Sequence, residues 1–225
     1  MPEHSTKKLP HNVIFIKDKG KFRLASRNLT PEIRVYGERL INANGIEYRL
    51  WSPHRSKLGA MIEKKMTIPV KVDSLILYLG GGTGTTASHI SDIVNEGKLF
   101  VVEFSPRAMQ DLLNVCINRK NMIPVLADAN NPVSYKAVAG IVNVIYQDVA
   151  QPNQADIAIK NARTFLRPKG YVIMVIKARS VDSSISPKKV FEQEIAKLEA
   201  EFEILDKKGL KPFHEDHLAI IAQRK

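Results

Sequence analysis

A run of glycines directly after an apolar strand pattern restricts the fold of this chain more than any other feature. The apolar stretch 74–79 leads into Gly80, Gly82 and Gly84, and a helical pattern starts at Thr85. Glycine allows a tight turn and a close approach of the backbone to a ligand. Because such loops join a strand to a helix in open α/β sheets, the pattern predicts a ligand at the carboxyl end of this strand.

The spacing of these glycines narrows the kind of ligand. A dinucleotide fingerprint needs a small residue at position 85, where this chain has threonine, and a P-loop needs a lysine that does not follow here. What remains is G-x-G-x-G between a strand and a helix, a pattern typical of methyltransferases that use S-adenosylmethionine. We therefore expect S-adenosylmethionine as the cofactor.

The chain after residue 74 alternates between strand and helix patterns. Apolar stretches predict strands over 74–79, 98–103, 122–127, 142–147, 171–176, 203–205 and 218–222. Helical patterns fall over 85–95, 106–118, 153–166 and 187–199. Repeated β-α-β units with apolar strands imply a parallel sheet covered on both faces, and the last two strands should pair antiparallel at one edge. We predict a Rossmann-like α/β fold with a mostly parallel seven-stranded sheet.

The first 55 residues have a different character. Strand-like stretches over 12–16, 22–25 and 46–50 are separated by turn signals at Lys19-Gly20 and Asn44-Gly45, without a clear helical period. A length of 225 residues fits one domain of about 150–200 residues with a small addition. We expect a small β-rich domain over 1–55 and the methyltransferase domain over 56–225, with Trp51 packed between them.

The composition indicates an intracellular protein with a polyanionic partner. The net charge of +11 favours nucleic acid, although Lys-rich faces on an ordinary intracellular protein would also explain it. No apolar run of membrane-spanning length is present, and the first residues lack the apolar stretch of a signal peptide, so we expect a cytoplasmic location. Cys116, the only cysteine, lies in an apolar helical pattern and should be a buried structural thiol.

Acidic residues end three successive predicted strands. Glu103 follows Gly80 by about 20 residues, where a carboxylate can accept hydrogen bonds from both ribose hydroxyls. Asp128 ends the next strand, where it could meet an adenine amino group, and Asp148 ends the fourth, beside the expected methionine and sulfonium. Each acid alone could simply cap the following helix. Together with the glycine loop, they predict a cofactor crevice along the strand ends.

Lys177 ends the very apolar fifth strand. A lysine there could withdraw a proton from an acceptor hydroxyl or stabilise the forming oxyanion, whereas the ordinary interpretation is a strand-end lysine that reaches solvent. Asp148 could pair with it, and Lys57, at the start of an expected long helix, could complete a basic pocket. The wider basic run is either a solvated helix face or a phosphate track: Arg55, Lys57, Lys64 and Lys65.

Two histidines flank a pair of acids near the C-terminus. His214 and His217 stand three positions apart at the start of a predicted strand, so their side chains should point to opposite faces. We therefore expect no metal site.

Together these motifs resemble the fibrillarin-like family of RNA 2′-O-methyltransferases, and its short archaeal-type members above all. The matching segments cover nearly the whole chain: 51–58 (WSPHRSKL), 78–86 (YLGGGTGTT), 102–105 (VEFS), 128–130 (DAN), 146–152 (YQDVAQP) and 215–217 (EDH). The resemblance implies a catalytic set formed by Lys57, Asp148, Lys177 and His217. Beside the three glycines, it implies cofactor contacts at Thr85, Thr86, Glu103, Phe104, Asp128, Ala129, Asp148, Val149, Ala150 and Gln151.

The resemblance also implies how such an enzyme is directed. A box C/D guide RNA selects the ribose to be methylated in rRNA and tRNA, and a Nop-type scaffold protein and a kink-turn-binding subunit complete the particle. The residues alone support only a basic, S-adenosylmethionine-dependent methyltransferase with a strand-end lysine. At that level two alternatives stay open: a methyltransferase for small molecules or proteins, and a non-catalytic subunit of an RNA particle with a vestigial cofactor fold.

Overall fold

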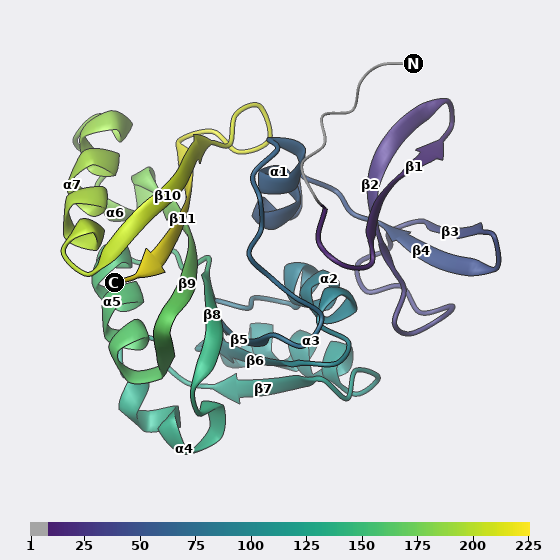
Figure 1. The fold of residues 1–225 in the computed structure, drawn as a ribbon, viewed down its shortest axis with the longest axis horizontal. Coiled ribbons are helices and arrows are strands. Elements are labelled where there is room, and N and C mark those ends of the chain that lie inside the picture. The colour runs from purple at the N-terminus through teal and green to yellow at the C-terminus, as the bar shows by residue number, and fades with distance from the viewer. Residues whose placement is uncertain (1–8) are drawn as a thin grey trace.

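The structure, a computed structural model, describes residues 9–225 and contains two separate sheets (Figure 1). The polar segment 1–8, which entered the expectation of a cytoplasmic location, lies outside the described residues. Between residues 9 and 225 no helix combines the length and the apolar character that a membrane crossing requires.

The N-terminal sheet is antiparallel throughout and has the order β1-β2-β4-β3. Its strands are β1 (Val13–Asp18), β2 (Lys21–Arg27), β3 (Leu40–Ala43) and β4 (Ile46–Leu50). The predicted turns Lys19-Gly20 and Asn44-Gly45 close its two hairpins, and all four residues have the positive φ that tight hairpin turns require. Strand β3 was not predicted, because its four residues form an edge strand that exists only through pairing with β4.

The larger sheet confirms the predicted fold class. Its order is β10-β11-β9-β8-β5-β6-β7, with parallel pairing from β9 to β7 and antiparallel pairing of β11 with both β9 and β10. The strands are β5 (Leu75–Leu79), β6 (Lys98–Glu103), β7 (Met122–Leu126), β8 (Val142–Gln147), β9 (Leu166–Lys177), β10 (Phe202–Gly209) and β11 (His217–Arg224).

Helices cover both faces of this sheet because its strands are apolar on both sides. On β5, Ile76 and Tyr78 belong to one core, while Leu77 and Leu79 belong to the other. The first core includes α1 (Lys57–Glu63), α2 (Thr85–Ile93) and α3 (Pro106–Cys116), which lie toward the N-terminal sheet in Figure 1. The second includes α5 (Gln154–Phe165) and α7 (Pro187–Glu199). The sequence patterns did not predict three short helices of four residues each: η1 (Pro132–Tyr135), α4 (Lys136–Ala139) and α6 (Ala178–Val181).

Helix α1 is shorter than the long helix expected from Lys57. It begins at Lys57, with the Ser56 hydroxyl accepting from Gly59 N, and it ends after seven residues at Glu63. The backbone then turns, and Lys65 has φ of 59°, which no α-helix accommodates. Lys64 and Lys65 therefore do not continue a helical basic face.

A buried network of four charged side chains joins the N-terminal sheet to α2 and to the segment after α3. Nη1 of Arg119 lies 2.6 Å from Oδ1 of Asp92, and Nη1 of Arg49 lies 3.2 Å from Oδ2. Nε of Arg49 lies 2.6 Å from Oε1 of Glu38, and none of the four side chains is more than 2% exposed. Asp92 stands on α2 and Arg49 on β4, so opposite charges hold the N-terminal sheet against the larger domain.

Trp51 packs between the two sheets, as predicted. Its ring is buried and stacks on the His89 ring of α2, with centroids 4.5 Å apart and planes inclined by 6°. Burial, together with the charges of Arg49 and Arg119, holds the pKa of His89 well below its usual range. This histidine is therefore a neutral packing partner. Cys116 is half-buried beside the same core, and burial raises the pKa of its thiol to about 11, consistent with a structural role.

We predict that Asp92→Asn lowers the free energy of unfolding by about 3–5 kcal/mol, because two buried guanidinium groups would then share one carboxylate. Urea denaturation measures the change. The matched control is Asp111→Asn on the exposed side of α3, which should stay within about 0.5 kcal/mol of the parent protein. Equal stabilities of the two variants would contradict the role given to the network.

Candidate active site

A cavity of about 460 Å³ lies at the carboxyl ends of the parallel strands, where open α/β sheets bind ligands. The glycine loop after β5 forms its floor, and the first turn of α2 and the ends of β6, β8 and β9 form its walls. Most of the predicted cofactor residues line it: Gly80, Gly82, Thr85, Thr86, Glu103, Phe104, Ala129, Asp148, Val149, Ala150 and Gln151.

The glycine loop is shaped by close contacts on one side and by open space on the other. A Cβ on Gly80 would lie 3.0 Å from the carbonyl oxygen of Asp148, and one on Gly81 would lie 2.2 Å from Val101. A Cβ on Gly82 would meet nothing within 4 Å. Gly84 begins α2 with φ of 90° and packs against α3, so it shapes the loop without lining the cavity. The first N–H groups of a helix have no acceptor within it, and Thr85 and Thr86 of the first turn of α2 line the cavity, which suits a polar ligand.

Glu103 and Asp128 stand at adjacent strand ends, yet the structure uses them differently. The Glu103 carboxylate is buried on the cavity wall, where it accepts hydrogen bonds from Gly82 N (2.8 Å) and Ser105 N (2.9 Å). It thereby fixes the glycine loop, and each oxygen keeps a second lone pair for a ligand hydroxyl. Asp128 accepts from the backbone and side-chain amides of Asn130 instead. Ala127 and Ala129 form the wall at that strand end.

Asp148 lies between two lysine side chains that come from distant parts of the chain. Nζ of Lys177 is 2.7 Å from its Oδ1 and 2.8 Å from its backbone oxygen, and Nζ of Lys57 is 3.1 Å from its Oδ2. Asp148 and Lys177 line the cavity, whereas Lys57 reaches Asp148 from α1. Two ammonium groups around one carboxylate leave one net positive charge beside the cavity, which is suited to a developing negative charge.

His217 lies on the neighbouring strand β11, in register with Lys177, but it is not among the residues that line the cavity. Its Nδ1 contacts the carbonyl oxygen of Glu215, and because a carbonyl can only accept, Nδ1 carries the proton and Nε2 has a free lone pair. Burial lowers the pKa of His217, and the charge of Lys57 lowers it further, whereas the hydrogen bond to the Glu215 carbonyl raises it. The resulting pKa lies below the usual 6.5. The imidazole is therefore neutral near pH 7.

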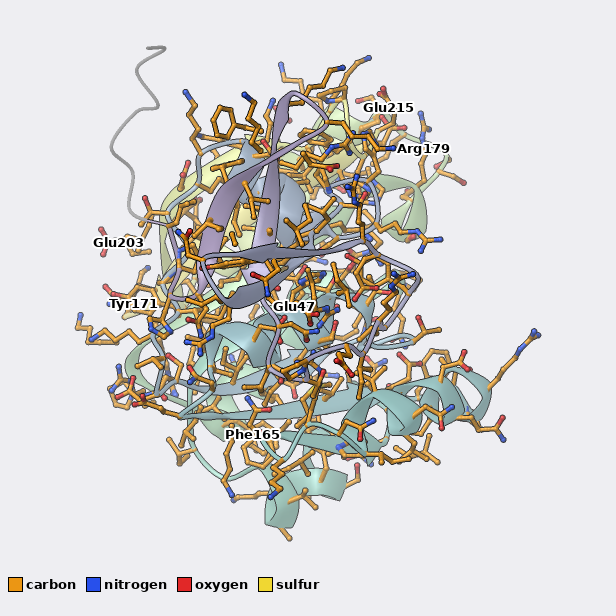
Figure 2. All side chains as sticks on the ribbon, turned by 90° about the vertical axis from the view of Figure 1, so that its right-hand side faces the viewer. Glu47, Phe165, Tyr171, Arg179, Glu203 and Glu215 are labelled. Atoms are coloured by element: carbon orange, nitrogen blue, oxygen red, sulfur yellow. The ribbon has the colours of Figure 1, made fainter. Side chains whose placement is uncertain are left out.

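The expectation that His214 and His217 point to opposite faces is wrong. Their ring centroids are 5.6 Å apart, because β11 begins only at His217 and Asp216 has φ of 51°, so strand alternation does not apply before it. Asp216 pairs with Arg179 at 2.9 Å, and Figure 2 shows Arg179 and Glu215 at the same end of the molecule. Over residues 9–225 no three metal-ligating side chains of the His, Cys, Asp or Glu type come together.

Some residues of the cavity were not predicted as cofactor contacts. Tyr78 on β5 and Arg55 in the segment before α1 both line it. Tyr78 looks like an ordinary core residue in the sequence, and Arg55 belongs to the basic run for which the sequence allows two interpretations, a solvated helix face or a phosphate track. The structure divides that run: Lys57 joins the cluster around Asp148, and Lys64 donates to the carbonyl of Lys211 on the β10–β11 loop.

Comparisons with known proteins agree with this geometry. The family model for fibrillarin matches residues 5–225. A fibrillarin-like rRNA/tRNA 2′-O-methyltransferase of Methanosarcina barkeri is 53% identical over 216 residues, covering 94% of this chain and 96% of the relative. Aeropyrum pernix fibrillarin, solved with natively bound S-adenosyl-L-methionine, is 48% identical, with a TM-score of 0.86 over 93% of this chain and 92% of that one. A fibrillarin solved in a complex with Nop5p is 40% identical, with a TM-score of 0.90 over 97% and 100%.

Proposed function

Because this chain belongs to the fibrillarin family, as its motifs indicated, we propose that it is an S-adenosylmethionine-dependent RNA methyltransferase acting on the 2′-hydroxyl of ribose in rRNA and tRNA. The relative from Methanosarcina barkeri bears the name of this activity, and the relative from Aeropyrum pernix binds this cofactor. The observation that carries the proposal is the Lys57–Asp148–Lys177 cluster beside the cavity at the strand ends.

The residues of the cavity fit S-adenosylmethionine. The open side of Gly82 allows a close approach of the ligand, and Glu103 keeps lone pairs for ribose hydroxyls. Asp148 brings a carboxylate to the wall for the positive sulfonium. When bound, the cofactor supplies an electrophilic methyl group. We propose that the cofactor contacts predicted from the sequence form its binding site. In this site Gly84 determines the shape of the glycine loop, and Asp128 holds Asn130 in place.

The charged cluster would lower the cost of removing the hydroxyl proton. A ribose 2′-hydroxyl is a poor nucleophile until its oxygen carries negative charge. We propose that the Lys177 ammonium, held by Asp148, stabilises this oxygen, and that Lys57 keeps the Asp148 carboxylate oriented. His217, neutral and with Nε2 unprotonated, would accept the proton.

The two alternative functions are less consistent with this geometry. A methyltransferase for small molecules has no evident use for a net charge of +11. A vestigial subunit would have no reason to keep two lysines on one carboxylate beside a cavity of about 460 Å³, a size within the usual range for ligand sites.

We propose that the protein works as the catalytic subunit of a box C/D ribonucleoprotein. A relative forms a complex with Nop5p, which supports a Nop-type scaffold as partner. A guide RNA is the economical source of specificity, because a 2′-hydroxyl is the same on every nucleotide and phosphate contacts carry no sequence information. The guide RNA, the kink-turn-binding subunit, the cytoplasmic location and the domain division at residues 55 and 56 remain predictions.

We expect site-specific methylation only in the assembled particle. The test maps 2′-O-methyl groups on target RNA after incubation with S-adenosylmethionine, with and without guide RNA and scaffold proteins. Methylation at the guided nucleotide in the full mixture, and none by the protein alone, is the expected result. Transfer to protein or small molecules in place of RNA would refute the proposed function.

We predict that Lys177→Ala reduces single-turnover methyl transfer by about 10²–10³-fold, because the reacting oxygen loses the positive charge proposed to stabilise it. Cofactor affinity, measured by calorimetry, should stay close to that of the parent protein, since the glycine loop and Glu103 are unchanged. Lys160→Ala, on the exposed side of α5, is the control and should retain full activity. A Lys177→Ala variant with most of its rate would exclude this role.

The proposed role of His217 predicts that the rate of methyl transfer falls at low pH. Since the folded pKa lies below 6.5, His217 is unprotonated at neutral pH and becomes protonated only as the pH falls through that lower value. Single-turnover rates should therefore fall on acidification, with the midpoint of the decline below pH 6.5. The decline should be absent in His217→Gln, whose rate is low throughout. If the rate of the variant falls at the same pH as that of the parent protein, the titrating group is not His217.

A further inference from the structure

A second cavity of about 460 Å³ lies between the N-terminal sheet and α1, and the proposed reaction does not use it. Its walls are the start of β2, the loop before β3, the segment 50–55 and Glu63 of α1; we call it the β2–α1 cavity. Figure 1 shows the β1–β2 hairpin on the side of the molecule toward which α1 lies. Arg55 lines this cavity and the active-site cavity alike, so the two are neighbours.

The β2–α1 cavity has an excess of positive charge. Four basic side chains line it: Lys21, Arg23, Arg39 and Arg55. Of its two acidic residues, Glu38 is already occupied by Arg49 and by the backbone amides of Val35 and Tyr36. Arg23 and Arg39 share one partner, Asp18, at 3.4 and 2.6 Å, and both remain about half exposed. Basic groups therefore remain available to an anion at the cavity.

Apolar and aromatic side chains form the rest of the lining. Leu24 and Trp51 are buried in the floor, and Leu50 and Pro53 adjoin them. Phe22 places an aromatic ring at the mouth with 58% of its surface exposed. Aromatic rings beside basic groups are the usual means of holding unpaired nucleotides, because every base has a face that stacks and every linkage has a phosphate.

Arg55 connects this lining to the reaction. Its guanidinium lies over the Tyr36 ring, 5.5 Å from the centroid, and donates to the Tyr36 carbonyl oxygen at 2.9 Å. A guanidinium has five N–H donors in a planar fork, which suits a phosphate. A polyanion that enters the active-site cavity can therefore continue past Arg55 into the β2–α1 cavity.

We propose that the β2–α1 cavity binds an unpaired nucleotide of the RNA, near the nucleotide that is methylated, with its base against the apolar lining and the adjoining phosphates on Lys21, Arg39 and Arg55. The inference rests on the proposed function, because RNA is the polyanion expected at the neighbouring site. An acidic protein segment would match the charge, but it would not account for the continuity with the site where RNA reacts.

The only tryptophan of the chain gives a local readout, because Trp51 lines the cavity. The full-length protein, with S-adenosylmethionine present to fill the other cavity, is titrated with uridine monophosphate and with a short single-stranded oligouridylate. We expect both to change the Trp51 fluorescence. Lys21→Gln and Arg39→Gln should each weaken oligouridylate binding by about tenfold. They should also reduce the salt dependence, by about 0.7 in the log–log slope for each phosphate that the variant no longer neutralises.

Arg167→Gln is the matched control, because Arg167 is exposed near the start of β9, at the opposite end of that strand from Lys177. It should keep the parent affinity and salt slope. Unchanged fluorescence and unchanged affinity in both cavity variants would overturn the proposal. So would variants that keep RNA affinity but lose binding to a Nop-type scaffold, since the cavity would then serve a protein. Failure of the parent protein to methylate RNA in the assembled particle would refute the proposed function separately, because the titration requires no methyl transfer.

Discussion

The parallel pairing of β5, β6, β8 and β9 is the constraint on which the site depends. Parallel strands end at the same edge of a sheet, so Gly80, Glu103, Asp148 and Lys177, which are far apart in sequence, come together around one cavity. Parallel sheets are usually covered on both faces, and helices pack on each side of this one. A ligand can therefore approach the sheet only at the ends of its strands. The polar side chains of the candidate active site gather around the cavity at these strand ends.

The N-terminal sheet helps to position residues of the candidate active site. The buried charges of Arg49, Asp92, Arg119 and Glu38 fix it against α2, the helix whose first turn lines the active-site cavity. The chain passes from β4 through the segment 51–56 into α1 and so carries Arg55 and Lys57 to that cavity. Loss of one partner leaves an uncompensated buried charge, so each of these four side chains matters for the attachment.

Positive charge is used in two different ways. Lys57 and Lys177 are held by a carboxylate, so their position is fixed and they suit the stabilisation of one oxygen. The basic side chains around the β2–α1 cavity are more exposed and surround apolar surface, which suits a nucleotide. Arg55 belongs to both cavities, so binding and reaction would share one side chain.

The sequence by itself determined the strand–helix order, the glycine loop and the acids at strand ends, because periodicity and glycine spacing are local properties. The bounds predicted for β6, β8 and α7 match the structure. Local patterns could not reveal β3, which needs its partner strand, or the facing rings of His214 and His217, which depend on a turn at Asp216. Tertiary structure alone decided that Lys57 meets Asp148 across 91 positions, because contacts between distant segments depend on how the elements pack. The contact of Asp128 with Asn130 is local, but the residue types alone do not say whether the Asp128 carboxylate accepts from this neighbour or faces a ligand.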